Sequence, residues 1–403
     1  FNLLERFFAR QDETPGDENN YERQVRLTMS RRNQPDWDDV QIAWEPFDIA
    51  LADLLELLEK IYHAWDELDS YEIPHHADLW QEIMAQQRSL REVRGAVNQA
   101  INEPKNESIY WATINQRTGD VTIHAAPLHV GATLQKNLFA TRETVILTSA
   151  TLRIGDSFAY IKNRLGLGEW ADELAVGSPF DYREAALVYV PTDVPEPGQP
   201  GYQKAVEGAL VDLLQATQGR ALVLFTSHSQ LQMTYRATAR RLEEADIFVL
   251  AQGLDGSRRQ VLDTFKTNER MALFGTKSFW EGVDVVGEAL SCLVMARLPF
   301  SVPSDPIFAA RSETFDDAFG QYAVPEAVLR FRQGFGRLIR SQSDRGIVVI
   351  LDKRVLTKNY GALFIESLPD CSKKQGPLKE LPAIAREWLG HAGAASEAAN
   401  GSE

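Results

Sequence analysis

The first hundred residues place apolar side chains at helical spacing. In ALADLLELLEKIYHAWDEL, Leu and aromatic residues recur three and four positions apart, and QEIMAQQRSLREVRGAVNQAI repeats this pattern. Positions three and four apart share one face of a helix, so both stretches predict amphipathic helices. The polar, Pro- and Asp-containing segments within residues 11–40 indicate loops or an exposed strand.

From about residue 108 the pattern changes to short apolar runs that alternate with amphipathic stretches. SIYWATI and VTIHAAP, joined by NQRTGD, predict a hairpin. Further strands are predicted at TVILTSA, ALVYV, RALVLFTS, IFVLA, MALFGT, ALSCLVMARLP and GIVVILD. Helices are predicted between them, and the last of these covers residues 322–340. Continuous apolar strands separated by amphipathic helices indicate an α/β fold, with helices on both faces of a parallel sheet.

Composition and charge add domain number and location to this picture. The chain has 403 residues, 44% of them hydrophobic and 25% charged, which is typical of a soluble globular protein with two or three domains. The net charge of −15 is uneven, because residues 1–105 hold 11 Lys or Arg against 22 Asp or Glu. No apolar run approaches the roughly 18 residues of a membrane span. Two cysteines fit a cytoplasmic protein, and Cys292 is expected in the core.

The stretch QGFGRLIRS, residues 333–341, concentrates arginine and glycine. On a helix over residues 324–340 an apolar stripe occupies one face. The opposite face carries Arg330, Gln333, Arg337 and Arg340. Residues 330–345 hold five arginines and one aspartate, so this row has almost no acidic partner of its own. A solvated face paired with acidic neighbours is the alternative, but guanidinium groups bind phosphate oxygens bidentately and suit a polyphosphate.

Two glycines interrupt the same predicted helix. Gly334 and Gly336 each cost about 1 kcal/mol relative to alanine in a helix interior. Their presence predicts that another backbone or a ligand approaches closely.

Small and polar residues follow three of the predicted strands. They are Ser149, Ala150 and Thr151 after TVIL, Thr226 and Ser227 after LVLF, and Thr276, Lys277 and Ser278 after MALFG. Ligands of open α/β sheets bind at the carboxyl ends of the strands, so these positions are candidate contacts. Capping of the next helix is the alternative for the hydroxyls. The aromatic pair Phe279 and Trp280 either anchors the loop on the core or stacks on a base.

The order TSAT, FTS, GTKSFWEGVD and QGFGRLIR resembles the C-terminal half of a superfamily 2 helicase. FWEGVDVVGEALSCLVMARLPFSVPSDP is similar to the DinG/XPD-like helicases, bacterial DinG type, and the resemblance covers about residues 106–385. It implies an arch-like helical insertion over residues 1–105, the end of a first RecA-like lobe with motif III over 106–175, and a second RecA-like P-loop NTPase lobe over 176–388. Residues 389–403 are expected to be a disordered tail.

In this family two RecA-like lobes close on ATP and single-stranded nucleic acid. The resemblance implies that Arg340 is the arginine finger, with Arg337 and Gln333 beside it at the nucleotide. The residues implied to bind or couple ATP are Glu281, Gly282 and Asp284, with Ser149, Ala150 and Thr151. The residues implied to contact nucleic acid are Thr226, Ser227, Thr276, Lys277 and Ser278.

Two nucleotide-binding motifs are missing from the chain. No Gly is followed by Lys, so there is no G-x-x-x-x-G-K-[ST] loop, and DELD at residues 66–69 closes a helical run rather than a buried strand. The chain starts with Phe and is interpreted as a piece of a longer protein whose first lobe binds most of the ATP and Mg²⁺. Some family members hold an iron–sulfur cluster through four cysteines before the arch; none is assigned here, and the longer protein's status stays open.

The expected function is therefore that of the C-terminal part of an ATP-dependent DNA helicase. The family implies 5′→3′ movement on single-stranded DNA in repair or replication, in a cytoplasmic monomer with no membrane partner. The piece alone is expected to be inactive, because the missing N-terminal lobe is its partner in catalysis. The alternatives are a non-catalytic nucleic-acid-binding RecA-like lobe and a GT-B-type transferase lobe. The residues themselves do not separate DNA from RNA.

Overall fold

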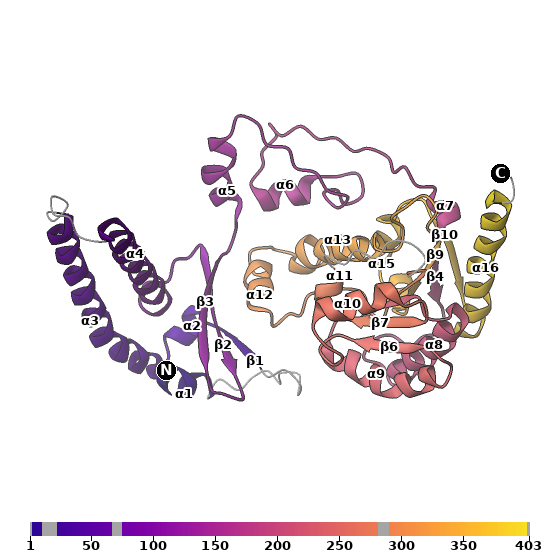
Figure 1. Ribbon diagram of the computed structural model, residues 1–403, viewed down its shortest axis with the longest axis horizontal. Coiled ribbons are helices and arrows are strands. Elements are labelled where there is room, and N and C mark those ends of the chain that lie inside the picture. The colour runs from indigo at the N-terminus through magenta and orange to yellow at the C-terminus, as the bar shows by residue number, and fades with distance from the viewer. Residues whose placement is uncertain (1, 10–21, 67–74, 281–289, 401–403) are drawn as a thin grey trace. The chain divides into compact units, whose positions relative to one another are not determined.

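The computed structural model describes residues 2–9, 22–66, 75–280 and 290–400. The chain divides into two compact units, one of residues 1–130 with 302–314 and one of residues 131–301 with 315–403 (Figure 1). The sequence analysis predicted boundaries at residues 105 and 175. The observed division falls after residue 130 rather than 105, because the predicted hairpin pairs with a strand of the N-terminal part and belongs to that unit. The assignment to an arch and two lobes stays a prediction.

The first unit combines a helical hairpin with a small antiparallel sheet of order β1-β2-β3. Its elements are α1 (Asn2–Ala9), β1 (Glu22–Arg26), α2 (Met29–Arg32), α3 (Pro35–Asp66), α4 (His76–Ile101), β2 (Ser108–Asn115), β3 (Val121–Pro127) and α12 (Pro306–Ser312). The two predicted helices and the predicted hairpin of strands are confirmed. α3 and α4 lie side by side (Figure 1). Trp37 is buried in the core of this unit.

The second unit is built on a seven-stranded sheet. Its strands are β4 (Ala186–Pro191), β5 (Ala221–Leu224), β6 (Phe248–Ala251), β7 (Met271–Gly275), β8 (Cys292–Met295), β9 (Gly346–Ile350) and β10 (Ser372–Gly376). Its helices are α5 (Gly131–Asn137), α6 (Ala159–Leu165), α7 (Tyr182–Ala185), α8 (Tyr202–Thr217), α9 (His228–Glu243), α10 (Arg258–Thr267), α11 (Lys277–Trp280), α13 (Val324–Phe335), α14 (Arg354–Thr357), α15 (Gly361–Glu366) and α16 (Leu381–Asn400). A π-helical turn over Phe319–Ala323 leads into α13.

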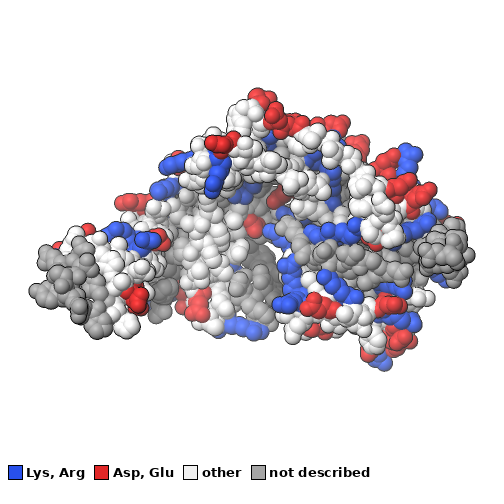
Figure 2. Space-filling view, turned by 45° about the horizontal axis from the view of Figure 1, so that its top comes forward, with Lys and Arg blue, Asp and Glu red and all other residues white. Residues whose placement is uncertain are grey.

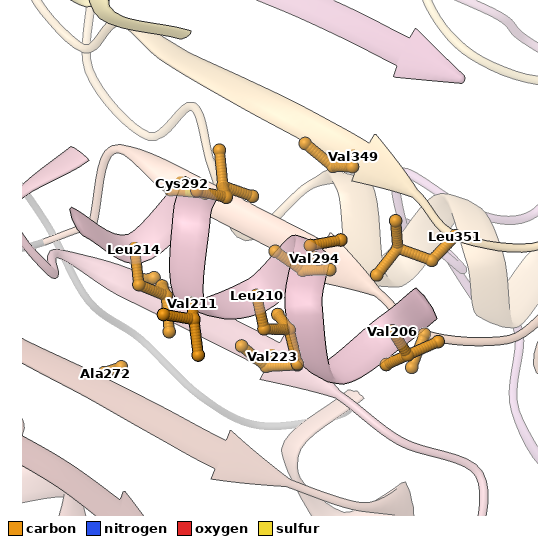
Figure 3. Close-up of a cluster of buried hydrophobic side chains, with 14 of the residues drawn as sticks. Val206, Leu210, Val211, Leu214, Val223, Ala272, Cys292, Val294, Val349 and Leu351 are labelled. Carbon is orange, nitrogen blue, oxygen red and sulfur yellow. The ribbon is translucent and has the colours of Figure 1, made fainter. Parts of the chain in front are cut away.

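All neighbouring strands of this sheet are parallel, in the order β10-β4-β9-β8-β5-β7-β6. One apolar cluster joins the sheet to α10 and α13. A second joins the opposite face to α8 and α16, where Leu210 and Leu214 of α8 lie over Val223, Val294 and Val349 (Figure 3). Helices on both faces confirm the predicted α/β class. Cys292 is fully buried in β8, as predicted.

Three stretches differ from the sequence prediction. TVILTSA contains no strand: Ile146 and Leu147 are exposed, and no strand of either sheet pairs with this segment. An isolated strand leaves its backbone groups without partners, so apolar periodicity alone does not form one. α16 continues to Asn400, where a tail from residue 389 was expected, because this stretch is rich in alanine. The polar edge strand β10 was missed because lysines occupy it, as is common at sheet edges.

No helix among the described residues has the length and apolar character needed to cross a bilayer.

Candidate functional site at the carboxyl edge of the sheet

The carboxyl ends of three neighbouring strands meet at Thr276. Its backbone N–H and its hydroxyl both donate to the side-chain oxygen of Gln252, over 2.8 and 2.9 Å, and its hydroxyl lies 3.2 Å from Nε2 of His228. His228 follows β5, Gln252 follows β6 and Thr276 follows β7. The structure therefore brings residues that follow β5, β6 and β7 together at one edge of the sheet. Gln252 was missed, because a single glutamine after a strand carries no pattern.

The hydroxyl residues at this edge have structural partners of their own. Ser227 caps α9 by accepting from the backbone N–H of Gln230 over 3.3 Å, so the capping alternative holds for this serine. Thr226, which follows β5, is half-buried, and Lys277, which follows β7, is exposed. The hydroxyl of Ser278 is buried, and within the described part of the chain it has no hydrogen-bond partner. A hydroxyl oxygen that caps a helix uses one lone pair and can still accept a second hydrogen bond.

Phe279 and Trp280 belong to the core rather than to a base-stacking surface. Both are almost completely buried, and the indole Nε1 of Trp280 donates to the backbone oxygen of Phe225 over 3.3 Å. The loop-anchor interpretation is therefore confirmed. The pair ties the turn after β7 to the end of β5, which holds the two strand ends in register.

The two glycines of QGFGRLIRS have different explanations. A Cβ at Gly334 would lie 2.8 Å from two carbons of the Trp280 ring and 3.1 Å from Cε of Met295, so only glycine leaves room for the indole. At Gly336 the nearest atoms are backbone oxygens at 3.5 and 3.6 Å, and this residue caps α13. A close neighbour is thus present at Gly334, but it is the Trp280 side chain rather than the predicted backbone or ligand, and at Gly336 no such close neighbour lies among the described residues.

The arginine row does not continue along one helical face. α13 ends at Phe335, and the N–H groups of Arg337 and Leu338 donate to residues three positions back. The prediction of a helix to residue 340 is therefore wrong, because the chain turns more tightly after the Gly336 cap. Arg330 also has an acidic partner within the helix, Glu326, at 3.3 Å.

Arg330 is a structural arginine. It donates to the backbone oxygen of Pro299 and to Oγ of Ser301, over 2.9 and 3.1 Å, and its side chain is 11% exposed. This largely buried guanidinium links α13 to the segment after β8. Gln333, one turn further, is half-buried.

Arg337 and Arg340 lie in the turn after α13. Arg337 donates from Nε and Nη2 to the backbone oxygen of Trp280, over 3.2 and 3.1 Å. The backbone N–H of Arg340 donates to Oδ2 of Asp344 over 2.7 Å, and the N–H and hydroxyl of Ser341 donate to the same carboxylate. Asp344 therefore shapes the turn that carries Arg340, a role that a lone aspartate in the sequence did not reveal.

The segment Ser149–Thr151 forms a turn closed by its own hydroxyls. Thr151 donates its N–H to Oγ of Ser149 over 3.2 Å, and the two side-chain oxygens lie 3.1 Å apart. Ser149 and Ala150 are exposed. Arg332 of α13 donates to the backbone oxygen of Arg153 over 2.8 Å, and burial lowers the pKa of Arg332. Arg332 was missed because it lies off the face that the helical wheel singled out.

Three predicted residues, Glu281, Gly282 and Asp284, lie outside the described residues. Among the described residues, no group of three His, Cys, Asp or Glu side chains is placed to hold a metal ion. A cavity of about 450 Å³ lies in the other unit, between β1, β2 and α12, and contains none of the predicted site residues. Charges of both signs are spread over the visible surface (Figure 2), so net charge does not mark a binding face.

Several known proteins are similar to this chain. The family described as helicase C-terminal domain matches residues 210–371, which contain β5 to β9 and the Arg337 turn. The chain is 38% identical over 289 residues to the 3′-5′ exonuclease DinG of Bacillus subtilis (strain 168), covering 69% of this chain and 31% of that protein. It is 37% identical over 276 residues to the ATP-dependent DNA helicase YoaA of Escherichia coli (strain K12), covering 67% of this chain and 42% of that protein.

A solved apo structure of XPD matches 93% of this chain and 68% of its own, with a TM-score of 0.55 and 15% identity. At this identity the likeness concerns the fold alone, and it confirms the predicted RecA-like α/β architecture. The chain spans between about a third and two fifths of the length of the curated relatives named above.

Proposed function

We propose that this chain is the C-terminal part of a DinG/XPD-like superfamily 2 helicase, an ATP-dependent DNA helicase. The observation that carries the proposal is the link between Arg337 and Trp280. It connects the turn after α13, which carries Arg337, to the segment after β7, which carries Thr276, within the matched region. A helicase needs such a link, because ATP hydrolysis must change its affinity for single-stranded DNA.

Arg337 and Arg340 are proposed to face the phosphates of ATP bound on a second RecA-like lobe. The donor chemistry fits: each guanidinium has five N–H donors in a planar fork that matches phosphate oxygens, and the two bonds to Trp280 orient Arg337. Gln333, on the last turn of α13, is proposed to lie beside the two arginines at the nucleotide. ATP would supply the free energy of phosphoryl transfer, and Arg340 would stabilise the charge that develops on its phosphate oxygens.

The nucleotide-binding loop and the Mg²⁺ ligands are proposed to come from residues outside this chain. No Gly–Lys pair occurs in the sequence, and arginines do not bind cations. The described residues thus fit the phosphates and not the metal. We expect this chain alone not to hydrolyse ATP.

The nucleic-acid contacts are proposed at the β5 and β7 ends. Thr226, Ser227 and Lys277 would meet the backbone of single-stranded DNA, since hydroxyls and ammonium groups bind phosphates without reading bases. Thr276 and Ser278, whose hydroxyls are buried, would support this surface from beneath. Glu281, Gly282 and Asp284, which follow directly in sequence, are proposed to couple this strand to ATP, together with Ser149, Ala150 and Thr151. Arg332, bonded to the backbone after Thr151, would hold that segment against α13.

The finer parts of the proposal rest on the family resemblance. They are 5′→3′ movement, a role in DNA repair or replication, a cytoplasmic location, a monomeric state, and the arch-like and first-lobe identities of residues 1–105 and 106–175. The alternative is a RecA-like lobe that binds nucleic acid without catalysis.

The test is ATP hydrolysis by the full-length protein that contains this sequence, with and without single-stranded DNA, for the wild type and Arg340→Ala. We expect stimulation by DNA and a loss of about 10³-fold or more in the variant, because an arginine finger contributes this much to phosphoryl transfer. The isolated chain should give no turnover. An unchanged rate in Arg340→Ala would favour the non-catalytic alternative.

A further inference from the structure

Gln252 follows β6 and bonds to Thr276, which follows β7. Its side-chain oxygen accepts from the backbone N–H of Thr276 over 2.8 Å and from the Thr276 hydroxyl over 2.9 Å. A backbone N–H can only donate, so the Gln252 atom that meets it is the amide oxygen and not the amide nitrogen. These contacts therefore fix the orientation of the amide, and its nitrogen Nε2 points away from Thr276.

The hydroxyl of Thr276 has one proton, and it gives this proton to Gln252, because the amide oxygen has none to offer. Nε2 of His228 lies 3.2 Å from the same hydroxyl and must then be the donor in that bond. The side chain of Thr276 is also buried. The hydroxyl proton is therefore not available to a ligand, and Thr276 is a positioning residue for the Gln252 amide.

The two N–H groups of Gln252 Nε2 have no acceptor within the described part of the chain. Asp255, the acidic side chain of the same turn, accepts instead from the backbone N–H of Ala251 over 2.8 Å and from the Tyr235 hydroxyl over 3.3 Å. Gln252 is half-buried, and its Nε2 reaches the surface rather than the core. These two donors are therefore open to a ligand at the carboxyl edge of the sheet.

The choice of an amide at residue 252 indicates the chemistry of that ligand. For holding Thr276 alone, a carboxylate would be the stronger acceptor, because hydrogen bonds to a charged oxygen are shorter and stronger. Glutamine instead avoids a negative charge at this position and adds two donors that face outward. Lys277, directly after Thr276, is exposed and carries a positive charge. Uncharged donors near an ammonium group suit an anion, which at a nucleic-acid site is the phosphate of the strand.

We propose that Gln252 donates from Nε2 to the phosphate backbone of single-stranded DNA, and that Thr276 and His228 position it for this contact. This role rests on the proposed function and adds a residue to it that the order of sequence motifs did not include. The direct contact at this point of the edge is the Gln252 amide and not the Thr276 hydroxyl beneath it. Donors to phosphate oxygens position a strand without reading its bases, so the contact serves any base sequence.

The test measures the affinity of the full-length protein that contains this sequence for fluorescently labelled single-stranded DNA. Gln252→Glu keeps an oxygen for both bonds from Thr276 and replaces the outward donors by a negatively charged oxygen. We expect it to weaken binding by at least about tenfold, because a donor is lost and the phosphate is repelled. Gln252→Ala removes the donors without adding charge and should weaken binding by about threefold or more.

Two further comparisons separate this contact from a structural role. Gln215→Glu is the matched control, since it makes the same exchange at an exposed residue near the end of α8, before the amino end of β5, and should leave the affinity within about twofold. In ATP hydrolysis, Gln252→Glu should raise the DNA concentration for half-maximal stimulation by at least about tenfold. Its kcat at saturating DNA should stay within about twofold, because Gln252 is not placed at the nucleotide.

The positioning role of Thr276 has its own pair of variants. Thr276→Val lacks the hydroxyl that orients the amide and should weaken binding by about threefold, whereas Thr276→Ser keeps the hydroxyl and should bind like the wild type. Equal affinities of these two variants would overturn the positioning role. Circular dichroism and the thermal midpoint report whether each variant is folded; if Gln252→Glu is not, Gln252→Met serves in its place.

The outcomes distinguish this contact from the proposed function on which it rests. If the wild type binds single-stranded DNA and is stimulated by it, but the Gln252 variants bind equally well, only the role of Gln252 is overturned. A weakening with oligo(dT) and none with oligo(dA) of the same length would make Gln252 a base contact and overturn the backbone role. If the wild type neither binds nor is stimulated, the proposed function fails, and the role of Gln252 fails with it.

Discussion

Arg337 donates two hydrogen bonds, from Nε and Nη2, to the backbone oxygen of Trp280. The same tryptophan fills the space that Gly334 leaves open and bonds to the backbone after β5. One buried ring therefore joins the proposed nucleic-acid side of the sheet edge to the arginine turn.

Replacing Gly334 by alanine should destabilise the second unit. The added Cβ would stand 2.8 Å from the buried Trp280 ring, and overpacking of this kind costs about 1–3 kcal/mol. Urea unfolding measures the loss. Gly336→Ala is the matched control, since its nearest neighbours are at 3.5 Å and it should change the free energy of unfolding by less than about 1 kcal/mol. Equal effects would contradict the packing explanation.

Arg337→Ala and Arg330→Ala should separate catalysis from stability. In the full-length protein we expect Arg337→Ala to lower kcat for ATP by about 10²-fold or more, because its guanidinium is proposed to contact phosphate. Arg330 is bonded to Pro299, Ser301 and Glu326, so its removal should lower the thermal midpoint instead. Turnover is compared well below both midpoints. A normal kcat in Arg337→Ala would assign this arginine to structure alone.

Asp344 is predicted to position Arg340 through the turn it closes. Asp344→Ala removes the acceptor for the N–H groups of Arg340 and Ser341 and should lower kcat while costing about 1 kcal/mol of stability. Asp344→Asn keeps one acceptor oxygen and should recover much of the rate. A merely structural role would lower the unfolding free energy in both variants without this recovery in kcat at temperatures where both are folded.

The protein should lose stability at alkaline pH, in part through Tyr202. Burial raises the pKa of this phenol to about 12, with Asp352 adding to the rise. Between about pH 10 and 12 the unfolded chain has lost the phenolic proton while the folded chain keeps it. The free energy of unfolding therefore falls with rising pH by up to about 1.4 kcal/mol per unit from this group. Urea unfolding across this range should give a shallower decline for Tyr202→Phe, and an identical slope would refute the assignment.

Both cysteines should resist thiol reagents in the folded chain. Burial raises the pKa of Cys292 to about 12 and also raises the pKa of Cys371, so little thiolate forms at pH 8. A colorimetric disulfide reagent should react slowly with the native protein and with two thiols per chain in denaturant. Rapid labelling of Cys292 without unfolding would contradict its place inside β8.

Local patterns were enough to predict most of the second unit. β4 to β9 are short apolar runs that a covered parallel sheet requires, and α8 coincides with YQKAVEGALVDLLQAT because its apolar residues recur at helical spacing. The order of motifs along the chain likewise indicated the resemblance to DinG/XPD-like helicases from the sequence alone. These features are set by neighbouring residues, so the sequence by itself determined them.

Other features depended on partners distant in sequence. TVILTSA has the apolar character of a strand but no paired neighbour, and α13 ends before Arg337 and Arg340 because the chain turns at Gly336. Only the tertiary structure decided three contacts between distant segments. Gly334 accommodates the Trp280 ring, Gln252 accepts hydrogen bonds from Thr276, and Tyr62 of α3 stacks on Trp80 of α4. The physical reason is that a periodic pattern states which residues share a face, whereas the element packed against that face is chosen by the whole fold.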